Sequence, residues 1–555
     1  MMPAFLSPKR RLSFILLLLL SFGQVAIGVT AANAVSLLFR QIERGDSPAA
    51  VLVALLLVAI VAGMVVEIFR RRVTESLGLG FATEVRLLLF ERLLRRPFSG
   101  SRRRSHGATL LPFVGDLTAL RQWMADGIAR GASAFLIAFG LCGYIAWRDP
   151  LLGAAQFALF LSAFALILLA ARPYGRATAE QRSRRGSLTS FVADRIAASH
   201  TVIALGGLDR ELKGARVRTD RMNESSLRRA LYSGVIRGVS QAAHLAASLL
   251  LLLLAFRQVA GGGLDTHQVV GLLTLTGLLS NCLADLGRAV ELALPGRISG
   301  QRLSQRLTES GSPAVSVEGL DCAGRATLQL KDVRLPGQAR VFSAQARNGD
   351  VILLKGPSGA GKSLLMAMIA GLQPSSGQVC ARGRSVTHLS RKRRRASLGL
   401  AAPYTPLLQD SLKRNLLYRG GDRANELARR LREFELAHFL DGSGTITDVV
   451  VRDGGRSLPA AQRQALQIIR AVLGRPSILL LDDVDDALSA VQADRLFELV
   501  MQWKGVVILS SRNPRVLTAV NRVWSIDRHA IRETRVAAEP ATRSAEIIAI
   551  AGERA

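Results

Sequence analysis

A glycine-rich segment in the second half of the chain has the residue types of a phosphate-binding loop. Residues 356–363 read Gly-Pro-Ser-Gly-Ala-Gly-Lys-Ser, which matches the pattern G-x-x-x-x-G-K-[ST] in full. The segment follows the apolar run "VILLK" and precedes "SLLMAMIAGL", which favours a helix. Backbone N–H groups of glycines approach phosphate oxygens closely, and the following helix directs its positive end at the same anion. The predicted nucleotide-binding residues are Gly356, Pro357, Ser358, Gly359, Ala360, Gly361, Lys362, Ser363 and Leu364.

A magnesium site is predicted beside this loop. In loops of this kind the lysine, here Lys362, reaches the β- and γ-phosphates, and the hydroxyl that follows, here Ser363, ligates Mg²⁺. A second apolar run, "SILLL", ends at Asp482. A carboxylate at the end of such a strand is placed to hold Mg²⁺, directly or through water. Alone this aspartate would be a weak signal, but after a phosphate loop it makes Ser363 and Asp482 the predicted metal ligands.

The segment around these residues has the pattern of a soluble α/β domain. The runs "GDVILLKG", "RPSILLLDD" and "KGVVILSS" are nearly continuous in apolar residues and end at polar ones, which is typical of buried parallel strands. We expect a nucleotide-binding domain over residues 326–535, a linker over 296–325 and a tail over 536–555.

The first 295 residues have the pattern of a membrane domain. The chain has 49% hydrophobic residues, and they concentrate here in six runs, at about 12–39, 49–69, 132–147, 151–171, 239–257 and 268–292. A spanning helix needs about 20 apolar residues. The first run has a basic start and an Ala-x-Ala sequence ending at Ala34, which also fits a cleaved signal peptide. The apolar character continues to Phe39 and favours an uncleaved helix, so residues 1–295 are predicted as an all-α six-span domain with two long loops.

The formal net charge is +31, carried mostly by arginine. Arginines gather before the first run and in the long loops at 70–131 and 172–238, whereas the other connections are short and nearly neutral. This distribution is the positive-inside pattern of membrane proteins. It predicts that both termini, the long loops and the nucleotide-binding domain are cytoplasmic, and it disfavours a nucleic acid as the partner. The four cysteines lack metal-ligand spacing and are predicted to be thiols without a disulfide framework.

Together these features resemble the ATP-binding cassette (ABC) exporters of the half-transporter type. The resemblance rests on residues 348–379, the six apolar runs and "DGGRSLPAAQRQALQIIRAVLGRPSILLLDD". It implies an all-α six-helix transmembrane domain followed by an α/β P-loop NTPase domain of the ABC type, with ATP and Mg²⁺ as ligands. In this family two halves pair, and each ATP lies between the phosphate loop of one half and the signature sequence of the other. The signature here is implied to be Leu458, Pro459, Ala460, Ala461 and Gln462.

Several residues depart from the family pattern. The signature is usually Leu-Ser-Gly-Gly-Gln, and Pro459 has neither the serine hydroxyl nor an N–H. Asp483 stands where the family has the catalytic glutamate and is one methylene shorter. Ser511 stands at the switch-histidine position, Pro403 at a loop glutamine and Ser489 at a loop aspartate. These departures predict that ATP is bound and that hydrolysis by this site is impaired. A slow but working ATPase and a non-transporting regulatory or structural subunit remain as alternatives.

The resemblance also implies partners. These are membrane lipid, an exported substrate that the sequence does not identify, and a second half-transporter. A heterodimer is favoured over a homodimer, and both remain open. The turns at 97–107 and 196–212 match the family's coupling helices. We expect a bacterial inner-membrane location from the resemblance and the arginine-rich composition.

The sixth run carries four polar residues at helical spacing, which could contact a substrate: Asn281, Asp285, Arg288 and Glu291. The alternative is that Asp285 and Arg288 pair with each other near the cytoplasmic end of the helix.

Overall fold

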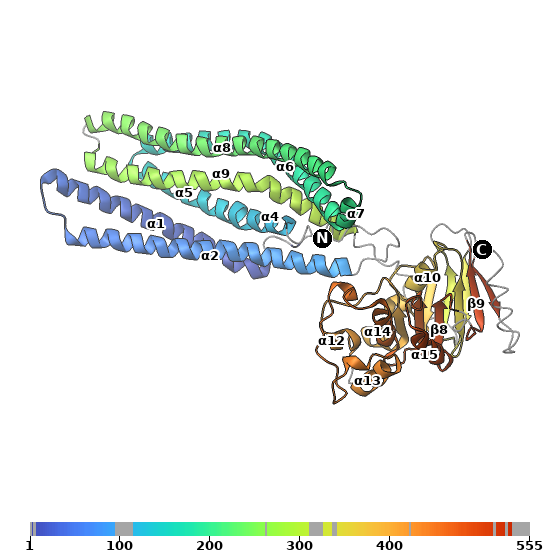
Figure 1. Cartoon of the computed structure of the whole chain (residues 1–555). Helices are drawn as coiled ribbons and strands as arrows, with labels where there is room; N and C mark the ends of the chain where they lie inside the picture. Colours follow the sequence, from blue (N-terminus) through green and yellow to red (C-terminus); the bar gives the residue numbers. More distant parts are fainter. Residues whose placement is uncertain are drawn as a thin grey trace. The chain divides into compact units, whose positions relative to one another are not determined.

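The computed structural model describes residue 3 and residues 7–94, 115–260, 264–309, 326–335, 341–420, 423–513, 518–527 and 531–535. The chain forms two compact units, one helical and one built on strands, and each is described by itself. Figure 1 shows the helical unit in blue to yellow-green and the second unit in yellow to red.

Long helices that run side by side make up the first unit (Figure 1). Six of its helical segments are long and apolar enough to cross a membrane, which confirms the six predicted spans. The helices are α1 (Pro8–Arg44), α2 (Ala50–Leu94), α4 (Leu117–Gln122), the π-helix η2 (Trp123–Ala129), α5 (Arg130–Arg148), α6 (Pro150–Ala197), α7 (Ser199–Ala204), α8 (Leu208–Ala260) and α9 (Thr266–Glu309). The third span consists of α4, η2 and α5 without a break.

Several helices are much longer than a bilayer requires. Helix α8 has 53 residues, which corresponds to about 80 Å at the α-helical rise, against a hydrocarbon core of about 30 Å. Helices α2, α6 and α8 therefore extend beyond a bilayer into the segments predicted as long loops. The short helix α7 lies within the predicted turn at 196–212, whereas the turn at 97–107 lies outside the described residues.

The predicted linker begins too early. Helix α9 continues to Glu309, so residues 296–309 are helical and belong to the first unit. The helix continues past Pro295 although this residue has no N–H to donate. The rest of the predicted linker and the predicted tail, 310–325 and 536–555, lie outside the described residues.

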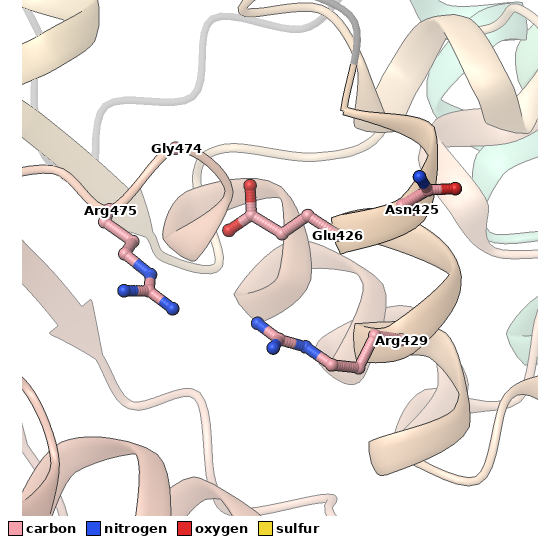
Figure 2. Close-up of a pocket in the computed structure, with 5 residues that line it drawn as sticks. All are labelled: Asn425, Glu426, Arg429, Gly474 and Arg475. Carbon is pink, nitrogen blue, oxygen red and sulfur yellow. The ribbon is translucent and has the colours of Figure 1, made fainter.

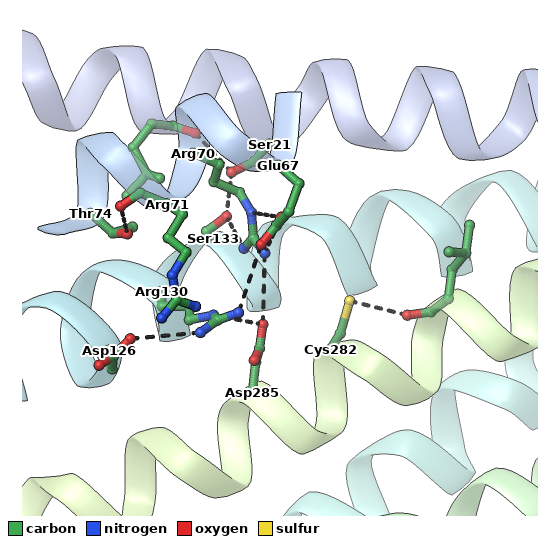
Figure 3. A network of polar contacts seen from close by, with 12 residues as sticks. Ser21, Glu67, Arg70, Arg71, Thr74, Asp126, Arg130, Ser133, Cys282 and Asp285 are labelled. Carbon is green, nitrogen blue, oxygen red and sulfur yellow. Dashed lines mark hydrogen bonds and ion pairs between the residues drawn. The ribbon is translucent and has the colours of Figure 1, made fainter. Parts of the chain in front are cut away.

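A cluster of charged side chains joins three helices of the first unit (Figure 3). Arg70 on α2 lies 2.6 Å from Glu67 and 3.9 Å from Asp285 on α9. Arg130 on α5 lies 3.2 Å from Asp285 and 3.6 Å from Asp126. Asp285 is therefore paired with arginines of neighbouring helices rather than with Arg288 of its own helix. We call these five residues the charged cluster.

The second unit is built on a six-stranded sheet with the order β10-β9-β3-β8-β7-β6. All neighbouring pairs are parallel except β9 and β10. The strands are β3 (Val351–Lys355), β6 (Leu398–Ala401), β7 (Ile478–Asp482), β8 (Val506–Ser510), β9 (Arg522–Ile526) and β10 (Ile531–Arg535). A four-stranded antiparallel sheet contains β2 (Phe342–Ala346), β1 (Leu328–Val333), β4 (Gln378–Ala381) and β5 (Arg384–Ser385).

Both faces of the six-stranded sheet are buried, which explains the continuous apolar runs of its strands. On β3, Ile352 and Leu354 pack in the cluster that also contains β1, β2 and α10 (Lys362–Ile369). Val351 and Leu353 pack in the opposite cluster with helices α14 and α15. The other helices of this unit are η3 (Val386–His388), α11 (Arg391–Ser397), α12 (Leu412–Leu416), α13 (Ala424–Glu433), η4 (Ala437–Phe439), η5 (Asp453–Gly455), α14 (Ala460–Val472) and α15 (Ala490–Met501).

The predicted α/β fold with parallel strands is confirmed. One prediction for this unit is wrong: Cys380 on β4 is disulfide-bonded, whereas Cys142 and Cys282 of the helical unit are free thiols. Spacing along the chain did not reveal the bond because a disulfide depends on which backbones the fold brings together.

Candidate functional site

The glycine-rich segment forms a tight loop between β3 and α10. Gly361 has a φ of +105° and precedes the first residue of α10, Lys362. A Cβ on Gly356 would lie 2.3 Å from the carbonyl oxygen of Ile526. Gly361 is therefore required for a left-handed backbone conformation, and Gly356 is required for close packing of the loop against β9.

Lys362 lies over its own loop. Its Nζ atom donates to the carbonyl oxygens of Gly356 and Pro357, at 2.8 Å and 3.2 Å. The ammonium is thus held in the concave side of the loop, where a phosphate group would meet both the lysine charge and the N-terminus of α10. This geometry fits the predicted phosphate site.

Asp482 ends β7 next to this loop and is 1% exposed. Burial raises its pKa, and hydrogen bonds from the hydroxyls of Ser363 and Ser510 oppose that rise. Its Oδ1 atom accepts from Ser510 at 3.0 Å. Its Oδ2 atom is buried and has no hydrogen-bond partner among the described residues.

The residues of this site fit a magnesium ion. Mg²⁺ prefers oxygen ligands and is usually held by one or two carboxylates plus phosphate oxygens. The structure brings together the hydroxyl of Ser363 and the carboxylate of Asp482, whose Oδ2 atom lacks a partner. A cation would compensate this buried carboxylate, so Ser363 and Asp482 would hold the ion.

Asp483 is the predicted catalytic carboxylate and follows Asp482 directly. Its φ of +45° is in the left-handed region, which few non-glycine residues adopt. Its Oδ1 atom accepts a hydrogen bond from Ser510 at 2.7 Å, and its backbone N–H donates to the same Oγ atom at 2.9 Å. Asp483 is therefore held against β8 by Ser510.

Ser511, at the predicted switch position, hydrogen-bonds to Asp485 rather than to the Asp482–Asp483 pair. Asp485 is 7% exposed, and burial raises its pKa while the hydrogen bond from Ser511 opposes the rise. Its Oδ1 atom is buried without a hydrogen-bond partner among the described residues. The sequence reasoning missed this carboxylate, although the run "LDDVDD" showed a surplus of aspartates.

The predicted signature lies at the start of α14. Pro459 is the residue before the helix and, like Ala460, is exposed. Within the part of the chain that the structure describes, no signature side chain makes a polar contact with the phosphate loop. Ser489, at the position of the family's loop aspartate, caps α15 in a capping box with Gln492. The signature residues Leu458, Pro459, Ala460, Ala461 and Gln462 are thus not brought to this chain's own loop.

Tyr404 is a second residue that sequence reasoning missed. It follows Pro403, and its hydroxyl donates to the carbonyl oxygen of Ser363 at 3.4 Å. Burial and the charge of Asp482 raise its pKa. Arg470 on α14 donates to the carbonyls of Thr405 and Pro406, so the loop that carries Tyr404 is tied to the helix that the signature begins.

The second unit also has an open pocket of about 600 Å³. Figure 2 shows Glu426 and Arg429 extending from α13 toward Arg475, with Asn425 and Gly474 completing the lining. None of the predicted site residues lines this pocket, so it does not take part in the nucleotide chemistry described above.

Comparison with known protein families matches both units. A family model described as the ABC transporter transmembrane region matches residues 11–283, and one described as ABC transporter matches residues 340–485.

Similar proteins share the two-part organisation over most of the chain. An ATP-dependent lipid A-core flippase of Pseudomonas aeruginosa is 24% identical over 79% of this chain and 74% of its own length. A multidrug resistance ABC transporter ATP-binding and permease protein of Lactococcus lactis is 22% identical over 85% of this chain and 80% of its own. The mitochondrial ATP-binding cassette sub-family B member 10 of Mus musculus is 24% identical over 87% of this chain and 70% of its own.

Proposed function

The chain belongs to the ABC transporters, as an exporter-type half-transporter with six spans and one nucleotide-binding domain, and we propose that it binds Mg²⁺ and ATP and uses them to export a substrate with a weak hydrolytic site of its own. The observation that carries this proposal is the contrast within one site. The phosphate loop and Asp482 have the geometry of a binding site. By contrast, the carboxylate of Asp483 is hydrogen-bonded to Ser510, and the hydroxyl of Ser511 is hydrogen-bonded to Asp485.

Nucleotide binding is supported by Lys362, Ser363 and Asp482. Lys362 would exchange its two carbonyl acceptors for phosphate oxygens, which gives a charge-assisted contact in place of neutral ones. When bound, Mg²⁺ would offset the negative charge of the phosphates. Asp482 would supply a carboxylate oxygen, Oδ2, that makes no other hydrogen bond among the described residues.

Weak hydrolysis follows from the geometry of Asp483. A carboxylate that orients water must reach the water beside the γ-phosphate. Asp483 is one methylene shorter than glutamate, and its Oδ1 atom is hydrogen-bonded to Ser510. A misplacement of about 1 Å costs about a hundredfold in rate. The Oδ2 atom does not share this contact and would have to hold the water. Because the side chain is shorter, this atom lies farther from the γ-phosphate than a glutamate oxygen would.

We propose that a second half-transporter pairs with this chain. The exposed Pro459 and Ala460 leave the signature open to a partner's ATP. On the part of α8 nearest α7, Leu227 and Leu231 are 72% and 64% exposed, and an apolar stripe outside the membrane needs a protein partner. A heterodimer is favoured because a homodimer would join two altered signatures to two weakened catalytic sites. In a heterodimer, however, the ATP of an intact partner would still contact the altered signature of this chain, so a heterodimer also has an impaired site. A homodimer is therefore kept as the second arrangement.

The location that fits the charge pattern is a bacterial inner membrane with the nucleotide-binding domain in the cytoplasm. Positive residues flank the apolar runs of α1 and α2: Arg10 lies before the first run and Arg70–Arg72 follow the second. Export of amphipathic molecules is consistent with the names of the bacterial relatives, a lipid A-core flippase and a multidrug transporter.

The second candidate function is an ATP-binding regulatory or structural subunit with little turnover. The pairing of Ser511 with Asp485 favours it, because a side chain committed to that contact does not face the γ-phosphate.

ATP turnover by the purified chain in nanodiscs tests these proposals, beside a Lys362→Ala control. Turnover that disappears in the control supports a transport ATPase that works as a homodimer. ATP binding without turnover supports the regulatory function or a need for a partner half, and adding candidate partners separates these two. Absence of ATP binding would contradict both candidate functions.

A further inference from the structure

A polar chamber lies between α8 and α9 of the helical unit. Its volume is about 420 Å³. Its charged and amide-bearing lining residues are Arg237, Gln241, Asn281, Asp285, Arg288 and Glu291. A narrow crevice of about 20 Å³ adjoins the chamber, and His244 and Ser280 line both. The rest of the crevice lies between α6, α8 and α9 and is mainly apolar, with Leu159, Phe160, Leu279 and Leu283 in its walls.

The accessible charge of the chamber is positive. The Asp285 side chain is 22% exposed and is paired with Arg130 at 3.2 Å. Glu291 is 13% exposed, accepts from Ser233 at 2.6 Å and lies 3.8 Å from Arg237. Both acids are therefore covered and compensated.

The cations, by contrast, face the open space. The Arg237 side chain is 78% exposed. Arg288 is exposed and has no ion-pair partner within the described ranges. A ligand that enters the chamber meets these guanidinium groups first, and the ligand chemistry that they favour is a phosphate or carboxylate.

The crevice ends at a polar group that needs a partner. Gln156 is 1% exposed. Its Nε2 atom donates to the carbonyl of Ala247 at 2.8 Å, whereas its Oε1 atom is buried without a hydrogen-bond partner among the described residues. A buried acceptor of this kind is costly unless a donor reaches it. The crevice is large enough for about one water molecule, which would satisfy it.

The depth of the two spaces matches the layers of one membrane leaflet. Arg288 lies about 33 Å along α9 from Thr266, and Thr276 of the crevice about 15 Å, at the α-helical rise. With a hydrocarbon core of about 30 Å, the crevice lies near the middle of the bilayer. The chamber lies at the boundary on the side where α9 leads to the nucleotide-binding domain. An amphiphile in that leaflet places its head group at the level of the chamber.

We propose that the chamber forms a substrate site for an amphiphile with an anionic head group. Arg288 binds the anion, and Asn281 and Gln241 add hydrogen bonds. The part of this inference that concerns export rests on the proposed transport function, whereas binding does not.

Binding is tested with the full chain in phosphatidylcholine nanodiscs, by titration with dihexanoylphosphatidylglycerol. Two probes separate the parts of the ligand: glycerol 3-phosphate has the anion without chains, and dihexanoylglycerol has chains without the anion. We expect both to bind at least tenfold more weakly than the phospholipid. Arg288→Gln should weaken phospholipid binding about tenfold, whereas Gln156→Leu should leave it unchanged, because the hydroxyls of this phospholipid lie on its head group beside the anion and do not reach the crevice. Arg257→Gln is the matched control, because Arg257 is exposed at the opposite end of α8 and does not line the chamber.

Equal phospholipid affinity in Arg288→Gln and the unmodified chain would overturn the site. Glycerol 3-phosphate binding as tightly as the phospholipid would overturn the amphiphile class and leave a site for free phosphate esters. ATP binding, measured in the same samples, shows that each variant is folded and separates failure of the chamber from failure of the proposed function. In proteoliposomes, labelled phosphatidylglycerol that binds but does not cross the membrane with ATP would overturn its role as substrate.

Discussion

The Oγ atom of Ser510 lies 2.7 Å from Oδ1 of Asp483, and it accepts the backbone N–H of the same aspartate at 2.9 Å. The same Oγ atom lies 3.0 Å from Oδ1 of Asp482. A hydroxyl has one hydrogen to donate, so Ser510 bonds to one of the two carboxylates at a time. Asp482, the proposed metal ligand, and Asp483, the proposed catalytic carboxylate, are therefore coupled through one side chain.

Asp483→Glu should raise the rate of ATP hydrolysis. The added methylene extends the carboxylate beyond Ser510 and toward the γ-phosphate. We expect a gain of about 10- to 100-fold in kcat, the size associated with correcting a misplacement of about 1 Å. Steady-state phosphate release measures it, with Asp483→Asn as the control that should fall to the rate of Lys362→Ala. An unchanged rate in Asp483→Glu would show that reach is not what limits this site.

Ser510→Ala should weaken the Mg²⁺ dependence of nucleotide binding. The change removes the donor that orients Asp482 and leaves two adjacent carboxylates without the hydroxyl between them. Loss of a partner that orients a metal ligand typically costs about 10- to 100-fold in metal affinity. Titration of Mg²⁺ against a fluorescent ATP analogue measures this effect. Ser511→Ala is the matched control because Ser511 contacts Asp485, and an equal loss there would contradict the prediction.

Asp482→Asn should stabilise the nucleotide-free protein while it abolishes Mg²⁺ binding. Burial raises the pKa of Asp482, so its ionised form costs folding free energy, and this cost grows as the pH rises through the raised pKa. At pH 8 the variant should melt a few degrees higher, since about 1 kcal/mol moves Tm by about 2–4 °C in a domain of this size. The difference should shrink toward about pH 3, below the ordinary pKa of aspartate, where the wild-type carboxyl is mostly protonated in both states. Thermal melts with a chelator present check it, and a difference that grows toward low pH would refute it.

Arg470→Gln should weaken the coupling between ATP binding at the phosphate loop and the signature residues. Arg470 ties the loop of Tyr404 to α14 through the carbonyls of Thr405 and Pro406. Leaving two such carbonyls without their donor costs about 1–3 kcal/mol. Hydrogen exchange should show that ATP protects residues 458–462 in the wild type and much less in this variant, while Tyr404→Phe gives a smaller loss. Full protection in Arg470→Gln would mean that another contact carries the link.

Arg130→Gln should destabilise the helical unit. It removes the cation that lies near Asp126, Glu67 and Asp285, and leaves Arg70 as the remaining cation of the charged cluster. Arg130 and Asp285 are 17% and 22% exposed, so the loss should be a fraction of the about 3–5 kcal/mol that removing one partner of a fully buried pair costs. Thermal unfolding in detergent measures the loss. The double change Arg130→Gln with Asp285→Asn should recover part of it, and a double variant no more stable than the single one would argue against the pairing.

The sequence predicts best where a local pattern does the chemistry. The glycine-rich loop between β3 and α10 and the strand ending at Asp482 are predicted correctly as structural elements, because glycine spacing and apolar runs act over a few residues. Tyr404 and Asp485 were missed because their roles come from the contacts with Ser363 and Ser511, which lie far away along the chain. Asp285 illustrates the same limit in the helical unit: helical spacing suggested Arg288 as its partner, and packing supplied Arg130 and Arg70.

The length of α8 has a mechanical consequence. The helix runs for 53 residues from Leu208 to Ala260 without a proline, and a membrane encloses less than half of its length of about 80 Å. It therefore acts as a rigid lever whose pivot is the bilayer. Over the roughly 50 Å outside the membrane, a tilt of ten degrees moves the tip by about 9 Å. A small rotation of the spanning part of α8 thus produces a large displacement at the end of the helix next to α7. Conversely, a force on that end exerts a large torque on the spanning part, because the arm outside the membrane is long.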